Sequence, residues 1–384
     1  MNLAIFTPYN PCLLNCFEKT TTRVAVLCCT LKPVPSSTLA VHQNVLLAPF
    51  TTLRIGGPAR YFIEIHSEPE LFEAVAFARE HNLPIFVLGG GSNLLVSDSG
   101  FDGLVLHIAL DGPVHFSRNG SSIESTVSAG IEWNAFVLAA CEQGISGIEC
   151  LAGIPGSVGG TPVQNVGAYG QEVAETITSV RALDLATTSL VELSNAECGF
   201  AYRQSIFNSS DRGRYIVTAV SFRFDASAKP HLKYADLARH FDAALPMPIE
   251  VYHAVREIRH RKGMLLVEGE PDCRSAGSFF KNPVVPQATL GNIAATVNLD
   301  PAQIPHWPAG DNQIKLPAAW LLEQAGFPKG FALGNAGISS RHTLALINRG
   351  HATAADIVAL RDTIRKAVDQ HFAIELEQEP VQVG

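Results

Sequence analysis

Residues 275–283 hold the residue types best suited to chemistry in this sequence. They read Ser-Ala-Gly-Ser-Phe-Phe-Lys-Asn-Pro, so the hydroxyl of Ser278 follows Gly277 directly. Glycine can take a positive φ or let a ligand approach the backbone, and the two phenylalanines can anchor the segment in a core. Ser278 is therefore a candidate for a hydroxyl held beside a reacting atom. A strand end with a polar turn explains the same letters, since a serine without partners carries no activity.

A run of three glycines is the second feature. Gly89, Gly90 and Gly91 follow the apolar residues 85–88, and Ser92 and Asn93 complete the turn. Backbone N–H groups in such a turn can converge on a phosphate because no Cβ blocks the approach. The turn lacks the Gly-x-Gly-x-x-Gly spacing of a dinucleotide Rossmann site, and a plain tight turn has the same composition.

Residues 153–170 form a longer glycine-rich segment that also contains Val, Ile and Tyr. Glycine is costly to order, and a flexible linker would be richer in serine. The composition favours a close-fitting wall for a flat ligand.

These three segments resemble motifs of the UDP-N-acetylenolpyruvoylglucosamine reductase family. Residues 275–283 resemble its serine-containing signature, residues 89–93 its phosphate-binding turn, and residues 154–170 its long flavin loop. Tyr-Arg-Gln-Ser-Ile-Phe at 202–207 and Leu-Lys-Tyr-Ala-Asp-Leu at 232–237 match further motifs in the same order. The resemblance runs from about residue 44 to residue 384.

The resemblance implies an α+β protein with an FAD-binding fold of the vanillyl-alcohol-oxidase/PCMH type. Two α/β subdomains would bind FAD, and a C-terminal α+β domain would bind the substrate. Neither glycine-rich segment contains histidine, so we expect non-covalent FAD. The expected cofactor-binding residues are Gly89, Gly90, Gly91, Ser92, Asn93, Ile154, Pro155, Gly156, Ser157, Gly159, Gly160, Asn165 and Gly167.

The reaction implied by the resemblance reduces UDP-N-acetylenolpyruvoylglucosamine to UDP-N-acetylmuramate in peptidoglycan precursor synthesis. NADPH reduces FAD, whose N5 delivers a hydride to C3 of the enolpyruvyl ether, and a proton must then reach C2. Arg203 is the candidate that stabilises the developing charge, since guanidinium binds a carboxylate as a fork. An ordinary ion pair would also explain Arg203. Ser278 is the candidate acid and needs neighbours to activate it.

A carboxyl group near the C-terminus should complete this cluster, and here the sequence departs from the family. The usual tail reads Leu-Glu-Pro-Glu-Val, whereas residues 376–381 read Leu-Glu-Gln-Glu-Pro-Val. Ungapped matching from Phe372 and from Gly384 selects Glu379. Glu377 stays open as the alternative, because strand alternation puts both acids on one face. A solvated acidic tail would explain either residue.

Four further residues match positions that contact the substrate. Tyr169, Lys262 and Asn282 match contacts to the UDP-sugar, with Lys262 facing the diphosphate. Tyr234 resembles the substrate-covering tyrosine of the family's longer subclass, although a buried strand aromatic would fit as well. Because no separate Rossmann fingerprint exists, we expect NADPH to use the same cavity as the sugar nucleotide.

Periodicity and caps predict the elements that must position these residues. Ser67 and Glu70 form an expected capping box, and Leu71, Val75 and Ala78 share the face of the helix that follows. Thr353 and Asp356 cap a final helix in the same way. The expected strands are residues 59–65, a short buried strand at 85–88 and a strand-rich stretch at 180–224; the expected helices lie near 133–143, at 317–324 and after 353.

We expect four segments along the chain. Residues 1–40 lack periodicity and family resemblance and are expected to be a poorly ordered extension. Residues 41–110 and 111–262 would be the two FAD-binding subdomains. Residues 263–384 would be the substrate-binding domain, whose C-terminal tail returns to the active site.

The composition limits the class of protein. The chain has 384 residues, of which 47% are hydrophobic and 17% charged, an ordinary globular balance. A net charge of −8 argues against a nucleic-acid-binding surface. The eight cysteines lack metal-ligand spacing, so we expect no metal site and a reducing compartment. No apolar run is long enough for a membrane span. The apolar residues 24–31 lack the cleavage site of a signal peptide.

We therefore expect a cytoplasmic, NADPH-dependent flavoprotein oxidoreductase that acts as a monomer on a UDP-sugar. Two alternatives remain open. Another flavin oxidoreductase could use the same scaffold with a different substrate. A non-catalytic flavin- or nucleotide-binding protein is favoured only by the altered acidic tail.

Overall fold

The computed structural model of the chain describes residues 39–230, 232, 234–242 and 245–384. The predicted extension at residues 1–40 lies outside this part of the chain except for its last two residues, and so does Lys233 of the 232–237 motif.

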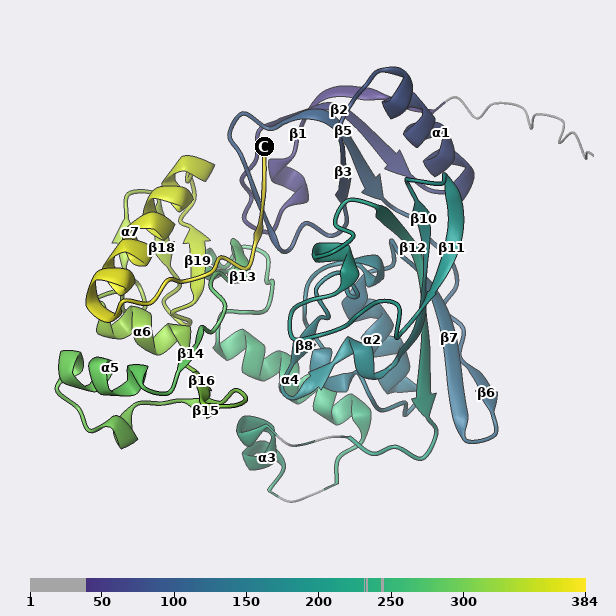
Figure 1. The fold of residues 1–384 in the computed structure, drawn as a ribbon. Coiled ribbons are helices and arrows are strands. Elements are labelled where there is room, and N and C mark those ends of the chain that lie inside the picture. Colours follow the sequence, from purple (N-terminus) through teal and green to yellow (C-terminus); the bar gives the residue numbers. More distant parts are fainter. Residues whose placement is uncertain (1–38, 231, 233, 243–244) are drawn as a thin grey trace, which may run out of the picture. The chain divides into compact units, whose positions relative to one another are not determined.

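The first sheet carries the glycine turn at the end of its edge strand (Figure 1). Its strand order is β1 (His42–Leu46), β2 (Pro58–Ile65), β5 (Phe101–Ile108) and β3 (Ile85–Leu88). β2, β5 and β3 run parallel, whereas β1 is antiparallel to β2. Strand β3 is less buried than predicted, because it lies at the sheet edge and only Leu88 is fully covered.

Helix α1 (Glu68–Glu80) packs its predicted apolar face against this sheet. Leu71, Val75 and Ala78 are buried with Ile63 and Ile65 of β2, as the 3.6-residue period requires. Only one of the two hydrogen bonds of the predicted capping box forms. Ser67 accepts a hydrogen bond from the Glu70 N–H, but the Glu70 carboxylate accepts from His66 instead of Ser67.

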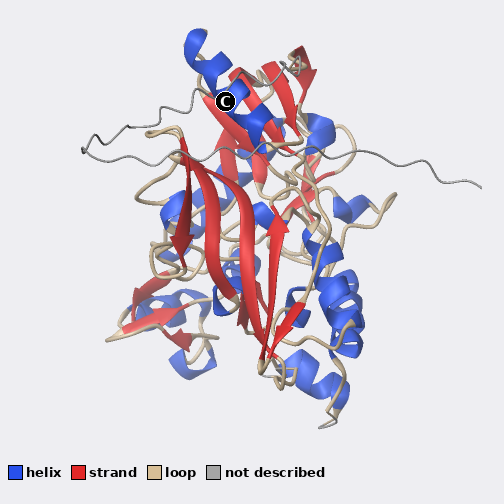
Figure 2. Cartoon of the chain, turned by 90° about the vertical axis from the view of Figure 1, so that its right-hand side faces the viewer, coloured by secondary structure: helices blue, strands red, loops and turns tan. Residues whose placement is uncertain are grey.

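The second sheet is antiparallel throughout, and Figure 2 shows its long strands side by side. Its order is β11 (Ser189–Ser194), β10 (Ile177–Asp184), β12 (Tyr215–Asp225), β7 (Ser122–Ser128) and β6 (Ser117–Asn119). Helix α2 (Trp133–Glu142) covers it through aromatic contacts, with the rings of Phe136 and Phe222 4.8 Å apart. Helix α4 (Pro248–Arg261) belongs to the same buried core.

The C-terminal elements form a separate core. A sheet of β13 (Ser275–Ser278), β19 (Ala345–Asn348), β18 (Ala336–Ile338) and β17 (Ala332–Leu333) packs with helix α7 (Ala354–Phe372). Thr353 and Asp356 form the predicted capping box of α7, and its predicted stripe of Ile357, Leu360, Ile364 and Val368 is buried.

The chain finally returns to the first sheet region. Strand β20 (Val381–Val383) pairs in parallel with β4 (Leu94–Val96), which directly follows the glycine turn. The remaining elements are β8 (Gly167–Ala168), β9 (Gln171–Glu172), α3 (Ala235–Phe241), β14 (Val284–Pro286), α5 (Thr289–Val297), β15 (Trp307–Pro308), β16 (Gln313–Lys315) and α6 (Ala318–Gln324). Of the described helices, none combines the length and apolarity needed to cross a membrane.

Candidate active site

The two predicted cofactor segments meet each other. A Cβ on Gly90 would lie 2.6 Å from the Gly156 Cα, and one on Gly89 would lie 2.9 Å from the Ser157 Oγ. The Ser92 hydroxyl donates to the carbonyl of Pro155 at 3.0 Å. Glycine is required at position 90 because any side chain there would separate the two loops.

The backbone N–H groups of the turn point to an anion site. In the described part of the chain, no backbone carbonyl accepts from the N–H groups of Gly89, Gly90 or Gly91. Gly91 takes a φ of +62°, which only glycine adopts at low cost. Unsatisfied N–H groups in such a turn favour a phosphate. The turn therefore fits the pyrophosphate of a flavin dinucleotide.

Helices α2 and α4 fix the start of the flavin loop at Gly153. The Asn134 amide oxygen accepts from the Gly153 N–H at 2.8 Å, and the Arg259 Nε donates to the Gly153 carbonyl at 3.1 Å. Arg259 is almost fully buried, and this burial lowers its pKa. Its guanidinium is thus part of the framework behind the loop.

The other loop residues divide into exposed and structural ones. Ile154, Pro155 and Gly156 are partly accessible, and Gly160 is exposed, so these four can face a ligand. Gly159 is buried, and a Cβ there would clash with Ala129. Asn165 is buried, its side chain bonds to Glu172, Ala201 and Ala174, and its N–H donates to the carbonyl of Pro162, so this residue supports the loop from within.

Arg203 occupies a tight turn that aims it at the C-terminal tail. Ala201 and Gln204 exchange backbone hydrogen bonds across this turn, and Arg203 has a φ of +55°. Its Nη2 donates to the carbonyl of Gly167 at 2.7 Å, and its Nε lies 3.3 Å from the Glu379 Oε1. A left-handed backbone at a residue with a side chain is strained, and such strain is concentrated at functional sites.

The structure separates the two candidate acids of the tail. The Glu379 side chain is 16% exposed, whereas the Glu377 side chain is 70% exposed and pairs with the Lys281 Nζ at 2.5 Å. Burial raises the pKa of the Glu379 carboxyl, and the charges of Arg203 and Lys281 offset only part of this rise. The geometry favours Glu379 as the partner of Arg203.

Ser278 ends β13, one residue before the Phe279 that pairs with Glu379. Its neighbours Phe279 and Phe280 are buried in the C-terminal core, as predicted, and the Glu379 N–H donates to the Phe279 carbonyl at 2.9 Å. The Ser278 Oγ lies 3.4 Å from the Nε2 of His342. Burial, together with nearby positive charges, lowers the pKa of His342 to about 4, so the imidazole is neutral near pH 7. Sequence reasoning missed His342, because no local motif connects it to Ser278.

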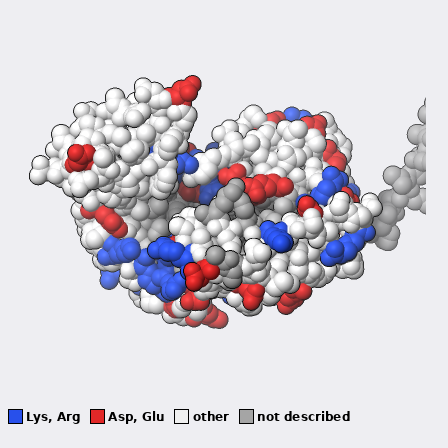
Figure 3. Space-filling view, turned by 90° about the horizontal axis from the view of Figure 1, so that it is seen from below, with Lys and Arg blue, Asp and Glu red and all other residues white. Residues whose placement is uncertain are grey.

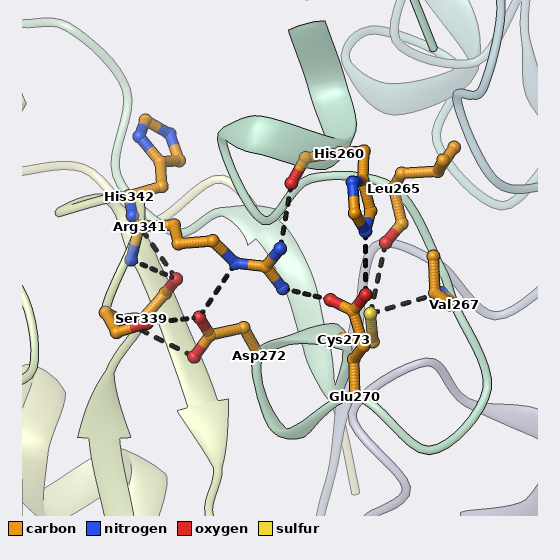
Figure 4. Close-up of polar contacts among 10 residues, drawn as sticks. His260, Leu265, Val267, Glu270, Asp272, Cys273, Ser339, Arg341 and His342 are labelled. Carbon is orange, nitrogen blue, oxygen red and sulfur yellow. Dashed lines mark hydrogen bonds and ion pairs between the residues drawn. The ribbon is translucent and has the colours of Figure 1, made fainter. Parts of the chain in front are cut away.

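A network of ion pairs holds the segment that carries His342 (Figure 4). The Arg341 Nε donates to Asp272 at 3.2 Å, its Nη1 donates to the carbonyl of His260 at 2.9 Å, and its Nη2 contacts Glu270. The Ser339 Oγ accepts from the His342 N–H at 3.2 Å. This network ties the His342 segment to the end of α4.

Lys262 caps the end of α4 and faces two of the predicted substrate residues. The rings of Tyr169 and Tyr234 meet edge to face at 5.1 Å, and the Lys262 Nζ lies 5.8 and 5.6 Å from them. The same ammonium group binds Asp236 at 2.7 Å. Burial lowers the pKa of Lys262, but Asp236 and the two tyrosines outweigh it, and the net shift is upward. The three predicted residues thus form one cluster.

Asn282 precedes β14, and Lys315 ends β16. The Asn282 amide oxygen accepts from the Ala318 N–H at the start of α6, so it is committed to the fold. Lys315, which was not predicted, has its Nζ 3.4 Å from the ring centre of Tyr202. Burial and the charge of Arg203 lower the pKa of Lys315. Figure 3 shows Lys, Arg, Asp and Glu side chains together along a hollow on one face of the molecule.

Two protein-family models match the chain. The FAD binding domain matches residues 59–194, and the C-terminal domain of UDP-N-acetylenolpyruvoylglucosamine reductase matches residues 270–383. The first match agrees with the fit of the glycine turn to a flavin dinucleotide and confirms the predicted cofactor, FAD.

Relatives named UDP-N-acetylenolpyruvoylglucosamine reductase align with nearly the whole chain. UDP-N-acetylenolpyruvoylglucosamine reductase of Thermobifida fusca is 44% identical over 356 residues, which cover 90% of this chain and 99% of that protein. The enzyme of that name from Streptomyces coelicolor is 43% identical over 368 residues, which cover 91% of this chain and 93% of that protein.

A solved structure agrees with these matches. The crystal structure of UDP-N-acetylenolpyruvylglucosamine reductase from Thermus caldophilus has a TM-score of 0.61 and 27% identity, covering 90% of this chain and all of that one. The predicted α+β flavoenzyme fold is confirmed by this likeness and by the FAD-domain match. The chain belongs to the UDP-N-acetylenolpyruvoylglucosamine reductase family.

Proposed function

We propose that the protein catalyses the FAD-dependent, NADPH-driven reduction of UDP-N-acetylenolpyruvoylglucosamine to UDP-N-acetylmuramate. The single observation that carries this assignment beyond family membership is the pair of Arg203 and Glu379, with Nε and Oε1 3.3 Å apart. Glu379 is hydrogen-bonded through its backbone to the residue that follows Ser278. A cation, a buried carboxyl and a hydroxyl are the groups that this reduction requires.

FAD, when bound against the turn at residues 89–93 and the loop at 154–160, supplies the hydride after reduction by NADPH. The chain's own residues stabilise the developing charge and supply the proton. When the hydride reaches C3 of the enolpyruvyl group, negative charge develops toward the carboxylate, and the guanidinium of Arg203 stabilises it. The Lys315 ammonium is a second cation beside Arg203 and adds to this positive potential.

The proton for C2 comes from the Ser278 hydroxyl. A serine hydroxyl is a weak acid, so it needs neighbours that orient it and restore its proton. The neutral His342 imidazole, 3.4 Å away, orients the hydroxyl. The raised pKa of Glu379 allows this carboxyl to hold a proton near the reaction centre.

The sugar nucleotide is bound by the cluster around Lys262. Its ammonium group faces the diphosphate and exchanges part of its contact with Asp236 for a phosphate oxygen. The rings of Tyr169 and Tyr234 cover the substrate. Asn282 contributes its amide N–H₂, since its oxygen is already bound to Ala318.

The domain bounds, assembly state and location of the protein are part of the same proposal. The protein is a cytoplasmic monomer, with FAD-binding subdomains at residues 41–110 and 111–262 and a substrate domain at residues 263–384. Size-exclusion chromatography with light scattering tests the monomer; a mass of twice 41.2 kDa would contradict it.

The reaction is tested with the purified protein. Its absorbance should reveal bound flavin, NADPH should bleach it, and enolpyruvyl-UDP-N-acetylglucosamine should restore it while gaining two hydrogens in mass. Reduced flavin that this substrate fails to reoxidise would favour another oxidoreductase on the same scaffold. A protein without flavin would favour a non-catalytic nucleotide-binding protein.

A further inference from the structure

The C-terminal tail changes its pairing partner at Glu379. Before that residue it pairs with the segment after Ser278: Lys281 donates to the carbonyl of Glu377, and Glu379 donates to the carbonyl of Phe279, each at 2.9 Å. Beyond it, the Val381 N–H donates to the carbonyl of Asn93 at 2.9 Å, and β20 pairs with β4.

The register of the tail against these two partners decides which acid faces Arg203. Alternate residues of an extended strand share a face, so a slip of two residues would put Glu377 opposite Arg203 without exposing the wrong face. Both acids lie on the Lys281 side, since Lys281 pairs with Glu377 and its charge also acts on Glu379. Alternation alone therefore does not select Glu379.

Arg361 of helix α7 holds the opposite face of the tail. Its Nη1 donates to the amide oxygens of Gln378 at 3.0 Å and Gln382 at 3.1 Å, and its side chain is only 14% exposed. The Gln378 Nε2 in turn donates to the carbonyl of Pro380 at 2.6 Å, across Glu379. These contacts fix the tail on both sides of the acid.

A two-residue slip would break this clamp, the pair of hydrogen bonds from Arg361 to Gln378 and Gln382. It would place Leu376 where Gln378 lies and Pro380 where Gln382 lies, and neither side chain can accept a hydrogen bond from Arg361. Arg361 would keep only its ion pair to the neighbouring Asp362, through Nε at 2.7 Å, and its partly buried Nη1 would lose both acceptors, which carries a desolvation cost. The clamp thus penalises the register that would present Glu377.

We propose that Arg361 is a positioning residue that selects Glu379 over Glu377 as the partner of Arg203. The inference rests on the proposed function for its effect on turnover, but its effect on tail register stands independently. It also explains how a tail with the proline displaced to position 380 still delivers a carboxyl to the site.

The first test separates the two half-reactions by stopped flow. Arg361→Ala should leave flavin reduction by NADPH within about twofold of wild type but slow flavin oxidation by substrate at least about tenfold. Combined with Glu379→Gln, it should add almost nothing, because both changes remove the same carboxyl from the site. Wild-type oxidation in Arg361→Ala, or fully additive losses in the double variant, would overturn the proposal.

A matched control lies one turn further along α7. Arg365 pairs with Glu375 at 2.6 Å, ahead of the tail segment that holds the acids. Arg365→Ala should behave as wild type in both half-reactions. If it slows substrate oxidation as much as Arg361→Ala, any charge loss on α7 has that effect, and the specific clamp is refuted.

Hydrogen exchange tests the register without relying on the reaction. The amides of Glu379 and Val381 should exchange at least about tenfold faster in Arg361→Ala than in Arg365→Ala. Gln378→Leu should reproduce the faster exchange, and Gln378→Glu, which keeps an acceptor for Arg361, should restore most of the protection. Unchanged exchange in Arg361→Ala and Gln378→Leu would overturn the proposal even if the wild-type enzyme fails with the expected substrate.

Discussion

The Nε of Arg203 lies 3.3 Å from the Oε1 of Glu379, yet the pKa of this carboxyl is raised rather than lowered. Burial of the carboxyl outweighs the nearby positive charge. A raised pKa suits a group that must hold a proton during part of a catalytic cycle. Glu377, on the same face, pairs with Lys281 in water and has no such environment.

Replacing these two acids should therefore have unequal effects. We expect Glu379→Gln to lower kcat by about a hundredfold or more, because a carboxyl that orients charge or a proton is lost. Glu377→Gln should cost almost nothing, since it removes only a solvated ion pair. Steady-state turnover at saturating NADPH measures both. If Glu377→Gln lowers kcat strongly and Glu379→Gln keeps the wild-type kcat, the tail takes the other register in solution.

Ser278→Ala should separate the proton donor from the hydride donor. We expect normal FAD binding and normal flavin reduction by NADPH, but loss of flavin oxidation by substrate, since C2 no longer receives a proton. Stopped-flow absorbance resolves the two steps. Ser275→Ala, at the other end of β13, is the matched control and should retain both. Near-normal oxidation in Ser278→Ala would remove Ser278 from the acid role.

Lys262→Met should weaken binding of the sugar nucleotide. The substitution keeps much of the side-chain volume but removes the cation between Tyr169 and Tyr234. We expect KM for the UDP-sugar to rise by about tenfold, with a smaller effect on kcat, because the diphosphate lies away from the reacting carbon. Arg261→Met is the control: it is exposed and pairs only weakly with Glu257 at 3.6 Å. Equal effects of the two changes would point to general surface charge instead.

The predictions from the sequence succeeded where the signal was local. The strand before the glycine turn, the cap and stripe of α7 and the buried phenylalanine pair follow from periodicity and side-chain chemistry. The exposed edge of β3 was not foreseeable, because strand order depends on pairing between distant segments. Helix α4 was missed as an element, although Pro248 stands at its first position.

The resemblance predicted that Arg203, Ser278 and a tail acid form one cluster, but no spacing within the sequence indicates this arrangement. Arg203 and Glu379 were each selected by resemblance, but only the fold brings them together through the return of β20 to β4. His342 and Lys315 escaped notice because a lone histidine and a lone lysine carry no spacing signal. The role of Asn165 as an internal support of its loop likewise depends on contacts with Glu172 and Ala201 that no local pattern reveals.

Gly90→Ala should impair FAD binding. Its Cβ would lie 2.6 Å from the Gly156 Cα, so the turn and the flavin loop would have to move apart. We expect a lower flavin content after purification and an FAD Kd raised by about tenfold or more, since the phosphate-binding N–H groups would shift. Gly291→Ala, in helix α5 with open space around it, should keep full flavin content. Wild-type affinity in Gly90→Ala would show that this close approach does not shape the cofactor site.

The final prediction concerns the pH dependence of stability at His342. Burial and the charges of Lys262, Lys329 and Arg259 lower its pKa from 6.5 to about 4. Between these values the unfolded chain binds a proton that the folded protein excludes, so stability rises with pH and is lost as the pH falls from 6.5 to 4. We expect His342→Gln to lose less unfolding free energy than wild type between pH 7.5 and pH 5, both measured by urea denaturation. His351→Gln, which changes an exposed imidazole, should follow the wild-type curve. If the His342→Gln curve also parallels that of wild type, the fold does not lower the pKa of His342, and its imidazole does not stay neutral as the pH falls below 6.5.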